Sequence, residues 1–525
     1  MQSPKLNYCL KFSIVYFCLI SIGAKTYAQV ITTDSVDRLV ERTLKTFDVP
    51  GIAIAIVKDD KIVYEKGYGV ASLKTNKKVD ENTLFGIASN SKAFTAAAIG
   101  ILCDEGKIRL DDKVTDYIPE FKMYDPYVTA EFTIRDLLTH RSGLGLGAGD
   151  LMDFPDSTDF SMKDVIHNLR YFKPVSSFRS KFDYDNQLYK VAGEVIARVS
   201  GMSWEDFIET RIMKPLQMDH SSASYQRLKD RSNVIDAHSP VDGTVVVIPR
   251  YLTITGNAAG GIYSSVADLS KWAIMQMNNG KYGDGKQLFS EGIHWQMWSP
   301  QTILQQGPRS YYNTHFAAYG LGWFLNDAKG YKQVSHTGGI DGMVTEITLL
   351  PELKLGIIVL TNQMAGAAFT AVTNQIKDSY LGIKPGQDWI KILSDQVKAN
   401  EAGADKVTAD VWKQVEAKKH DGSKTDITPF AGTYHDNWLG DVVISEKGGQ
   451  LWFAAKRSPK LTGQLLAYKG NTFVVKWIYR SMEADAFAMF SVDENGKPSG
   501  LKMKPVSPAT DFSFDFQDLD FTKVK

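Results

Sequence analysis

The sequence predicts a mixed α/β (α+β) fold, in which an antiparallel sheet flanked by helices, with an all-helical subdomain, precedes a small antiparallel β-barrel or sandwich. Three observations predict it. A helix and a hairpin open the chain, two strong strands occur within residues 343–361, and short alternating strands follow residue 428. With 525 residues, of which 43% are hydrophobic, the chain can bury a large core in two or three domains.

Residues 1–28 have the features of a secretory signal peptide. Lys5 and Lys11 precede the apolar run FSIVYFCLISIGA, and small residues stand before a cleavage site at Gln29. The apolar run of 13 residues is too short to span a bilayer comfortably, and the aromatic residues before Cys18 disfavour a lipoprotein. We therefore expect an exported protein, periplasmic or secreted, with no stable membrane insertion after cleavage.

The composition argues against several classes of function. The 60 basic and 60 acidic residues balance and no basic stripe occurs, so nucleic acid is not an expected partner. Cys103 is the one cysteine outside the signal and fits a small core residue. The nine histidines are scattered without an H-E-x-x-H motif, so we expect no metal and no cofactor. A small molecule or a peptide is the expected substrate, and the oligomeric state stays open.

The first large domain, residues 29–382, opens with a helical pattern over 36–47. Two strand-like runs, 52–57 and 62–68, follow as a hairpin. The chain then reaches FGIASNSKAFTAAAIGILCDEGKI, where apolar residues recur at helical spacing from Ser91 onward. Ser89 is expected in the first turn of this helix, on the same face as Lys92.

Ser89 and Lys92 have two interpretations. Ser89 could cap the helix and Lys92 could be solvated, which is the simpler reading of an isolated S-x-x-K pair. The helix is apolar on nearly every side, however, and burial lowers the pKa of a lysine that lacks an anionic partner. A neutral Lys92 could then accept the Ser89 proton, and the positive end of the helix would favour an anion beside the Ser89 backbone N–H.

Two further motifs precede a long helical pattern. In TIRDLLTHRSGLG a short helix ends in a Gly-rich loop, where His140 is expected to hold the loop by hydrogen bonds rather than to act as a base. Tyr184-Asp185-Asn186 stands directly before the helical pattern of residues 188–199. Asp185 or Asn186 could cap that helix, whereas Tyr184 and an amide side chain are also well placed to face a cleft.

A third motif, VSHTGGIDG, precedes predicted strands at 343–350 and 355–361. His336-Thr337-Gly338-Gly339 is expected at the edge of the sheet, where glycines leave room for a ligand to lie against the strand; an ordinary Gly-rich hairpin is the alternative.

The pattern changes in the C-terminal part of the chain. Residues 383–427 are polar and rich in Lys, Asp and Ala, so we interpret them as a partly helical linker. From 428 to 525, alternating strands are separated by turns such as Lys447-Gly448-Gly449. They indicate a separate β-domain without a catalytic constellation.

The motifs Ser89-x-x-Lys92, Tyr184-x-Asn186 and His336-Thr337-Gly338, in this order, resemble the signature of the penicillin-recognising serine hydrolases. The resemblance is to the class C β-lactamase branch with its esterase and D-aminopeptidase relatives. FGIASNSKAFTA, LLTHRSGL, GGIYSSVADLSKW and PELKLGIIVLTN occur in family order and extend it over residues 35–381. The C-terminal domain is similar to the lipocalin-like domain of some members.

The resemblance implies a role for each motif residue. Ser89 would be the acylated nucleophile and Lys92 its base. Tyr184 would exchange protons with the leaving group and the deacylating water, and Asn186 would bind the acyl amide. Gly339 and the Ser89 N–H would form the oxyanion hole, within a substrate-binding segment of His336, Thr337, Gly338 and Gly339.

One departure from the family pattern narrows the expected substrate. His336 stands where β-lactamases and carboxypeptidases of this family usually have lysine, and a neutral histidine gives a substrate carboxylate no permanent positive charge. We therefore expect an acyl-enzyme hydrolase of small esters or D-amino-acid-containing peptides. A β-lactamase, and a slow or non-catalytic binder of penicillin or peptidoglycan, are the alternatives.

Overall fold

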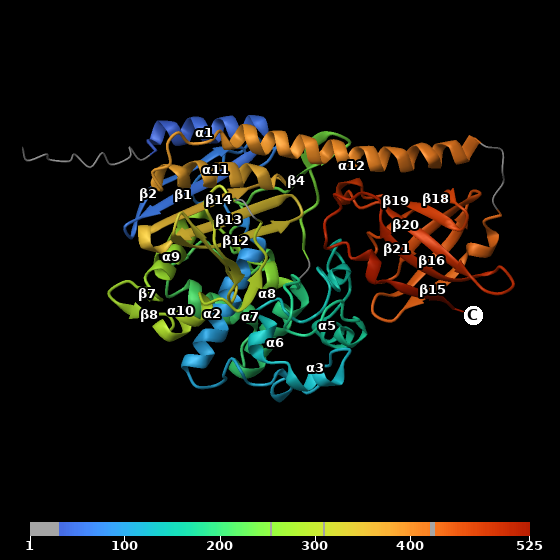
Figure 1. Ribbon diagram of the computed structural model, residues 1–525, viewed down its shortest axis with the longest axis horizontal. Coiled ribbons are helices and arrows are strands. Elements are labelled where there is room, and N and C mark those ends of the chain that lie inside the picture. The colour runs from blue at the N-terminus through green and yellow to red at the C-terminus, as the bar shows by residue number, and fades with distance from the viewer. Residues whose placement is uncertain (1–30, 253–254, 308–309, 421–425, 525) are drawn as a thin grey trace, which may run out of the picture.

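Figure 1 shows the computed structural model, which describes residues 31–252, 255–307, 310–420 and 426–524. The predicted signal peptide, residues 1–28, lies outside the described residues. A helix-flanked sheet and a β-barrel lie side by side, and the long helix α12 (Trp389–His420) runs along both. This architecture confirms the predicted fold class. In the described part of the chain, no helix combines the length and the apolar character needed to cross a membrane.

The large sheet has eight antiparallel strands in the order β2-β1-β14-β13-β12-β11-β10-β9. The pairing of β1 with β14 joins the two ends of the domain, and Ile52 of β1 lies opposite Thr361 of β14. The hairpins expected within 52–68 and 343–361 are β1-β2 and β13-β14. The strands are β1 (Gly51–Lys58), β2 (Lys61–Gly69), β9 (Thr302–Leu304), β10 (Ala317–Tyr319), β11 (Phe324–Ala328), β12 (Tyr331–Ile340), β13 (Met343–Leu350) and β14 (Leu355–Thr361).

Both faces of β1 are buried, and its alternating sequence GIAIAIVK matches two different helix layers. Ile52, Ile54 and Ile56 pack in one cluster with residues of α1 (Thr33–Thr46) and α11 (Gly366–Tyr380). Ala53 and Ala55 face the other layer, which contains α2 (Ser91–Asp104) and α9 (Val266–Met277). Helix α9 is capped by Ser265, whose side chain accepts a hydrogen bond from the Asp268 N–H.

Helix α2 is the central helix of the helical subdomain, and its side chains are buried from Ser91 to Leu102. Other helices, all of them short except α6, and small two-stranded sheets surround it (Figure 1). The helices are α3 (Pro126–Glu131), α4 (Ile134–Leu137), α5 (Met162–Asn168), α6 (Asn186–Ser200), α7 (Trp204–Ile208), α8 (Asn257–Gly260) and α10 (Glu291–Met297); the paired strands are β3 (Phe85–Gly86) with β6 (Tyr263–Ser264), β4 (His238–Val241) with β5 (Thr244–Val247), and β7 (Lys281–Tyr282) with β8 (Lys286–Gln287). Cys103 on α2 is only half-buried.

The C-terminal domain is a closed barrel, which decides between the predicted barrel and sandwich. Its eight strands pair in sequence order and β22 closes onto β15, as in up-and-down barrels. The strands are β15 (Gly432–Asp436), β16 (Gly440–Lys447), β17 (Gln450–Ala455), β18 (Thr462–Lys469), β19 (Thr472–Trp477), β20 (Ala486–Val492), β21 (Pro498–Pro505) and β22 (Asp520–Lys523).

Helix α12 occupies most of the segment interpreted as a linker. Near its start Trp389 and Ile390 are buried against the α1 and α11 layer. Near its end Val411 and Val415 pack against Val474 of the barrel. The helix therefore has an apolar contact at each end, and its polar middle explains why the sequence shows no continuous core face.

The His336 segment lies in β12, which is an interior strand and not the expected edge of the sheet. The neighbouring strand β11 is short, however, and its pairing with β12 stops at Ser335. Residues 336–340 of β12 are therefore paired only with β13 and leave their other side open. The free edge that the glycines suggested exists locally, because β11 is shorter than β12.

Candidate active site

Ser89 lies in a 3-10 turn, Ala88–Asn90, directly before α2, rather than in the first turn of the α-helix itself. Ala88 has a φ of +48°, a conformation that is unfavourable for a residue with a Cβ, so the turn is strained. The Thr345 hydroxyl of β13 holds the turn by donating to the Ile87 carbonyl at 3.0 Å. The buried Asn90 amide donates to the same hydroxyl at 2.9 Å.

Lys92 is fully buried, and its Nζ has three neighbours at hydrogen-bond distance. Ser89 Oγ lies at 2.9 Å, Asn186 Oδ1 at 2.7 Å and the Ala259 carbonyl oxygen at 2.9 Å. Burial lowers the pKa of Lys92 to about 7, against the nearby acidic Asp150 that raises it. A neutral amine has two N–H groups, which the two carbonyl-type oxygens accept, and its lone pair then faces the Ser89 hydroxyl.

Tyr184 and Asn186 come from the segment that enters α6. Lys92 Nζ lies 4.8 Å from the centre of the Tyr184 ring. Burial raises the pKa of the Tyr184 phenol well above its usual value, although a hydrogen bond with Ser89 partly offsets this. Asn186 connects two groups, because its Oδ1 accepts from Lys92 and its Nδ2 donates to Asp150 at 2.8 Å. Asp185 is the cap of α6 and accepts from the Leu188 N–H.

Strand β12 passes directly beside the turn that carries Ser89. A Cβ on Gly338 would lie 2.2 Å from the Ile87 carbonyl oxygen, so only glycine permits this approach. The Cβ position of Gly339 has no atom within 4 Å, and both Thr337 and Gly339 line the cavity described below. The open edge of β12 is thus available to a ligand beside Ser89.

His336 is buried and hydrogen-bonded at both ring nitrogens. Nδ1 lies 2.6 Å from the Thr337 carbonyl oxygen, to which it donates, so Nε2 accepts from the Tyr319 hydroxyl at 3.0 Å. Burial, and then the nearby Lys92, lower the pKa of His336 to about 3. The imidazole is therefore neutral at pH 7 and provides no positive charge to a substrate.

His140 holds its loop, as the sequence favoured. Its Nδ1 accepts from the Asp185 backbone N–H at 3.0 Å, and its ring stacks on Tyr184 at 4.2 Å. Burial keeps the pKa of His140 well below its usual value, and the nearby Lys92 lowers it further. The stacking gives His140 a second function, which is to fix the orientation of the Tyr184 ring.

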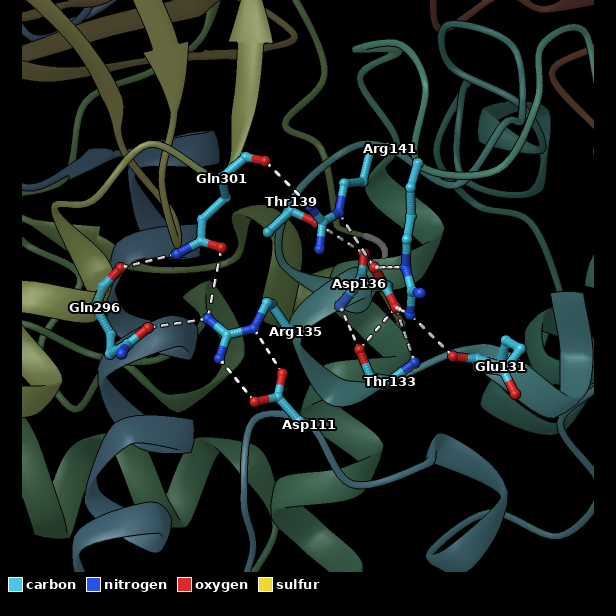
Figure 2. Close-up of polar contacts among 10 residues, drawn as sticks. Asp111, Glu131, Thr133, Arg135, Asp136, Thr139, Arg141, Gln296 and Gln301 are labelled. Carbon is cyan, nitrogen blue, oxygen red and sulfur yellow. Dashed lines mark hydrogen bonds and ion pairs between the residues drawn. The ribbon is translucent and has the colours of Figure 1, made fainter.

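A polar network under this loop fixes the segments of His140 and Tyr184 together (Figure 2). At its centre the buried Asp136 is the third residue of α4, forms a capping box with the N-cap Thr133, and accepts from the Thr133 hydroxyl at 2.7 Å. Asp136 also accepts from Arg141, which follows His140, and from Arg179, which precedes Tyr184. One carboxylate therefore joins the two loops.

The site opens into a cavity of about 600 Å³. Ser89, Tyr184, Asn186, His336, Thr337 and Gly339 line it from the large domain. Residues of the barrel line it as well, including Glu483, Asp511, Phe512 and Phe514. In the described ranges no three His, Cys, Asp or Glu side chains lie close enough to hold a metal ion.

The structure brings all the motif residues named from the sequence to one place, and it adds several that the sequence analysis missed. Asp150, Tyr319 and the Ala259 carbonyl contact these motif residues directly, and Phe512 comes from the other domain. The Asp at the end of the Gly-rich run 143–149 was a usable signal for Asp150. The other three have no local pattern that marks them.

Comparisons with known proteins agree with this arrangement. A family model described as Beta-lactamase matches residues 36–381, and one described as a domain of unknown function (DUF3471) matches residues 416–523. The chain is 26% identical over 499 residues to "Unguisins hydrolase ungD" of Aspergillus violaceofuscus, covering 89% of this chain and 86% of that protein. It is 29% identical over 342 residues to "Protein flp" of Staphylococcus aureus, covering 63% of this chain and 64% of that protein.

A solved structure shows the same fold. The octameric penicillin-binding protein homologue from Pyrococcus abyssi superposes with a TM-score of 0.60 at 21% identity, over 93% of this chain and 99% of that chain. The Beta-lactamase model spans the sheet-and-helix domain from within α1 to the end of α11 and includes every residue of the Ser89 site that the large domain contributes. The chain therefore belongs to the beta-lactamase family, the group of serine β-lactamases and penicillin-binding-protein-like hydrolases.

Proposed function

We propose that this protein is an exported serine hydrolase that cleaves ester or amide bonds through an acyl-enzyme on Ser89. The observation that carries the proposal is the environment of Lys92. Burial favours its neutral amine, and two acceptor oxygens take its N–H groups, which leaves the lone pair directed at the Ser89 hydroxyl 2.9 Å away.

The geometry supports a proton path. Ser89 Oγ attacks the substrate carbonyl while its proton passes to Lys92 Nζ, and the backbone N–H groups of Ser89 and Gly339 are the proposed donors to the resulting oxyanion. The leaving group departs with the proton of Tyr184, which stays protonated at pH 7 because its pKa is raised, and the proton on Lys92 then restores Tyr184. A water molecule then attacks the acyl-enzyme, the same proton transfers occur in reverse order, and the acid is released from Ser89.

The charge of the cavity supports neutral or amine-bearing substrates over carboxylates. His336 is neutral, and the buried Lys190 is paired with Asp153. The cavity lining also carries Asp341, Asp511 and Glu483. Small esters and D-amino-acid-containing peptides fit this charge better than penicillins, whose carboxylate the site does not neutralise. The name of the relative from Aspergillus violaceofuscus, a hydrolase, is consistent with hydrolysis.

Intact mass spectrometry tests the proposal. The chain from Gln29 and its Ser89→Ala variant are mixed with p-nitrophenyl acetate, a D-alanyl p-nitroanilide and benzylpenicillin. We expect Ser89-dependent turnover of the ester or the anilide and little consumption of penicillin. Rapid penicillin consumption would instead identify a β-lactamase, a lasting penicillin adduct would identify a binder, and no reaction with any probe would refute the hydrolase. Export is tested by the appearance of a chain beginning at Gln29 in the periplasm or medium.

A further inference from the structure

The barrel contributes a buried carboxylate to the large domain. Asp515, in the segment between β21 and β22, is fully buried and accepts from the backbone N–H groups of Gly149 at 2.7 Å and Leu151 at 2.9 Å. These two groups are at the start of the turn Asp150–Met152, and no side chain of the large domain caps that turn. A barrel residue is thus the cap of a turn in the other domain.

Two contacts connect the capped turn to Lys92, and a third connects Lys92 to Ser89. Asp150 accepts from Asn186 Nδ2 at 2.8 Å, Asn186 Oδ1 accepts from Lys92 at 2.7 Å, and Lys92 lies 2.9 Å from Ser89. The position of Asp150 therefore sets the orientation of the Asn186 amide, because the two ends of that amide have different partners. The carboxylate of Asp515 fixes the backbone on both sides of Asp150.

The same barrel segment also covers Tyr184. The Phe512 ring meets the Tyr184 ring edge-on at 6.0 Å, and a Cβ on Gly147 would lie 2.7 Å from the Phe512 carbonyl oxygen. Gly147 in turn donates its N–H to the Tyr184 carbonyl at 2.9 Å. Phe512 is 40% exposed and lines the cavity, so its outer face is available to a substrate.

We propose that barrel residues 511–515 are a working part of the active site, with Asp515 as a positioning residue for the Asp150, Asn186 and Lys92 chain and Phe512 as a specificity-determining residue of the cavity wall. This inference rests on the proposed function. It implies that the large domain holds its catalytic geometry only with the barrel docked.

The test compares kinetics of the full chain from Gln29 with those of Asp515→Ala, Asp515→Asn and Asp493→Ala, using the substrate that the wild type turns over. Asp493 is the matched control, because its side chain also accepts two backbone N–H groups, from Asn495 and Lys497, but within a barrel hairpin. We expect kcat of Asp515→Ala to fall about tenfold or more, with KM within about threefold of the wild type. Asp515→Asn keeps an acceptor oxygen and should recover much of kcat, and Asp493→Ala should retain it.

Hydrogen exchange in peptides covering 147–153 gives a readout that does not need activity. Exchange should rise in Asp515→Ala and not in Asp493→Ala. If exchange rises while kcat is unchanged, Asp515 docks the domains without positioning the site and the inference is wrong. If the wild type itself turns over no probe, the proposed function fails. Hydrogen exchange still reports in that case whether Asp515 holds the turn at Asp150, so the two failures can be told apart.

Phe512→Ala tests the role of Phe512 in the cavity wall separately. This variant keeps the inference testable if Asp515→Ala does not fold. We expect its kcat/KM to rise for p-nitrophenyl esters of long acyl chains relative to the acetate, because the cavity widens. An unchanged ratio would contradict the role of Phe512.

Discussion

At the scale of single residues, the proposed chemistry depends on a lysine that burial keeps close to neutral. Lys92 has no carboxylate partner among the groups at hydrogen-bond distance, so desolvation is not compensated by a direct ion pair. His336 in the third motif is kept neutral in the same way, because it is buried without an acid beside it. The site therefore contains few charges, and in the proposed mechanism the protonation state of Lys92 decides the activity.

We predict that kcat/KM for ester hydrolysis rises with pH through a midpoint near the Lys92 pKa of about 7. The sign follows because the neutral amine is the base, so activity is lost as pH falls and Lys92 is protonated. Asp150→Asn should move this midpoint to lower pH, because the ionised form of Asp150 raises the Lys92 pKa; burial raises the pKa of Asp150 itself to about 7, so that form is present in the upper part of the profile. Lys92→Arg should lose activity by about a thousandfold or more, because an arginine stays protonated. Rate profiles from pH 5 to 9 measure both effects, and a profile flat across pH 7 would exclude Lys92 as the base.

We predict that His336→Lys increases kcat/KM for benzylpenicillin by about tenfold, since a cation beside a substrate carboxylate contributes about 1.4 kcal/mol. His336→Gln, a neutral side chain of similar polarity, is the control and should give no gain. Activity toward p-nitrophenyl acetate, which has no carboxylate, should not gain in either variant. Equal penicillin rates for Lys and Gln at this position would show that charge does not explain the substrate preference.

The sequence could predict which residues gather at the site but not all of their contacts. Ser89 and Lys92 are three positions apart, so local helix geometry alone brings them together. Asn186 was expected to bind the substrate amide, and the structure shows that its side chain also contacts Lys92 and Asp150. Asp515 lies more than three hundred residues away in a domain without a catalytic motif, and only the docking of two domains brings it near. The catalytic roles themselves stay predictions.

At the scale of elements, the long regular strands and helices were predictable, and the short ones were not. The bounds of β13 and β14 could be predicted from their sequences, because β-branched and apolar residues predominate in both strands. This composition agrees with their burial, which includes every residue of β14. The strands β9 and β10 have three residues each, too few to show a period. Because they and β11 were missed, β12 was placed at an edge.

The Asp136 network shows how one side chain fixes two loops. Burial alone would raise the Asp136 pKa, but hydrogen bonds from Arg179 and Thr133 outweigh it and lower the pKa. We predict that Asp136→Asn destabilises the protein by about 3 kcal/mol, because two arginines lose a buried partner. The exposed Asp111, which pairs with Arg135 in the same network, is the matched control, and Asp111→Asn should cost less than about 1 kcal/mol.

The pH dependence of this difference gives a second check. Since the folded-state pKa of Asp136 is lowered, its ionised form stabilises the fold above the ordinary aspartate pKa of about 3.9, and this stabilisation is lost as pH falls through the folded-state value. Urea unfolding of wild type and Asp136→Asn at pH 7 and at acid pH should therefore converge at the lower pH. A constant difference would mean that packing, rather than charge, is responsible.

At the scale of the whole molecule, α12 connects the cores of both domains. Val415 is 1% exposed against barrel residues, whereas Val407 on the same helix is 47% exposed. We predict that Val415→Ala lowers the stability of the barrel by about 2 kcal/mol more than Val407→Ala does, since alanine improves helix propensity equally at both positions. Urea unfolding followed by tryptophan fluorescence measures the difference, and equal midpoints would show that α12 does not stabilise the barrel.

The 32 residues of α12 form one uninterrupted helix of about 48 Å. The number of residues in this helix therefore sets both the distance and the rotation between its contacts with the two domains. Inserting a single residue in its exposed middle would turn everything beyond it by about 100° and advance it by about 1.5 Å. Barrel residues 511–515 would then no longer reach Tyr184 and the turn at Asp150, even though no residue of either domain had changed. Substitutions in the middle of α12 are therefore free to accumulate while its residue count is held constant, and a chimera between relatives would have to preserve the helical phase.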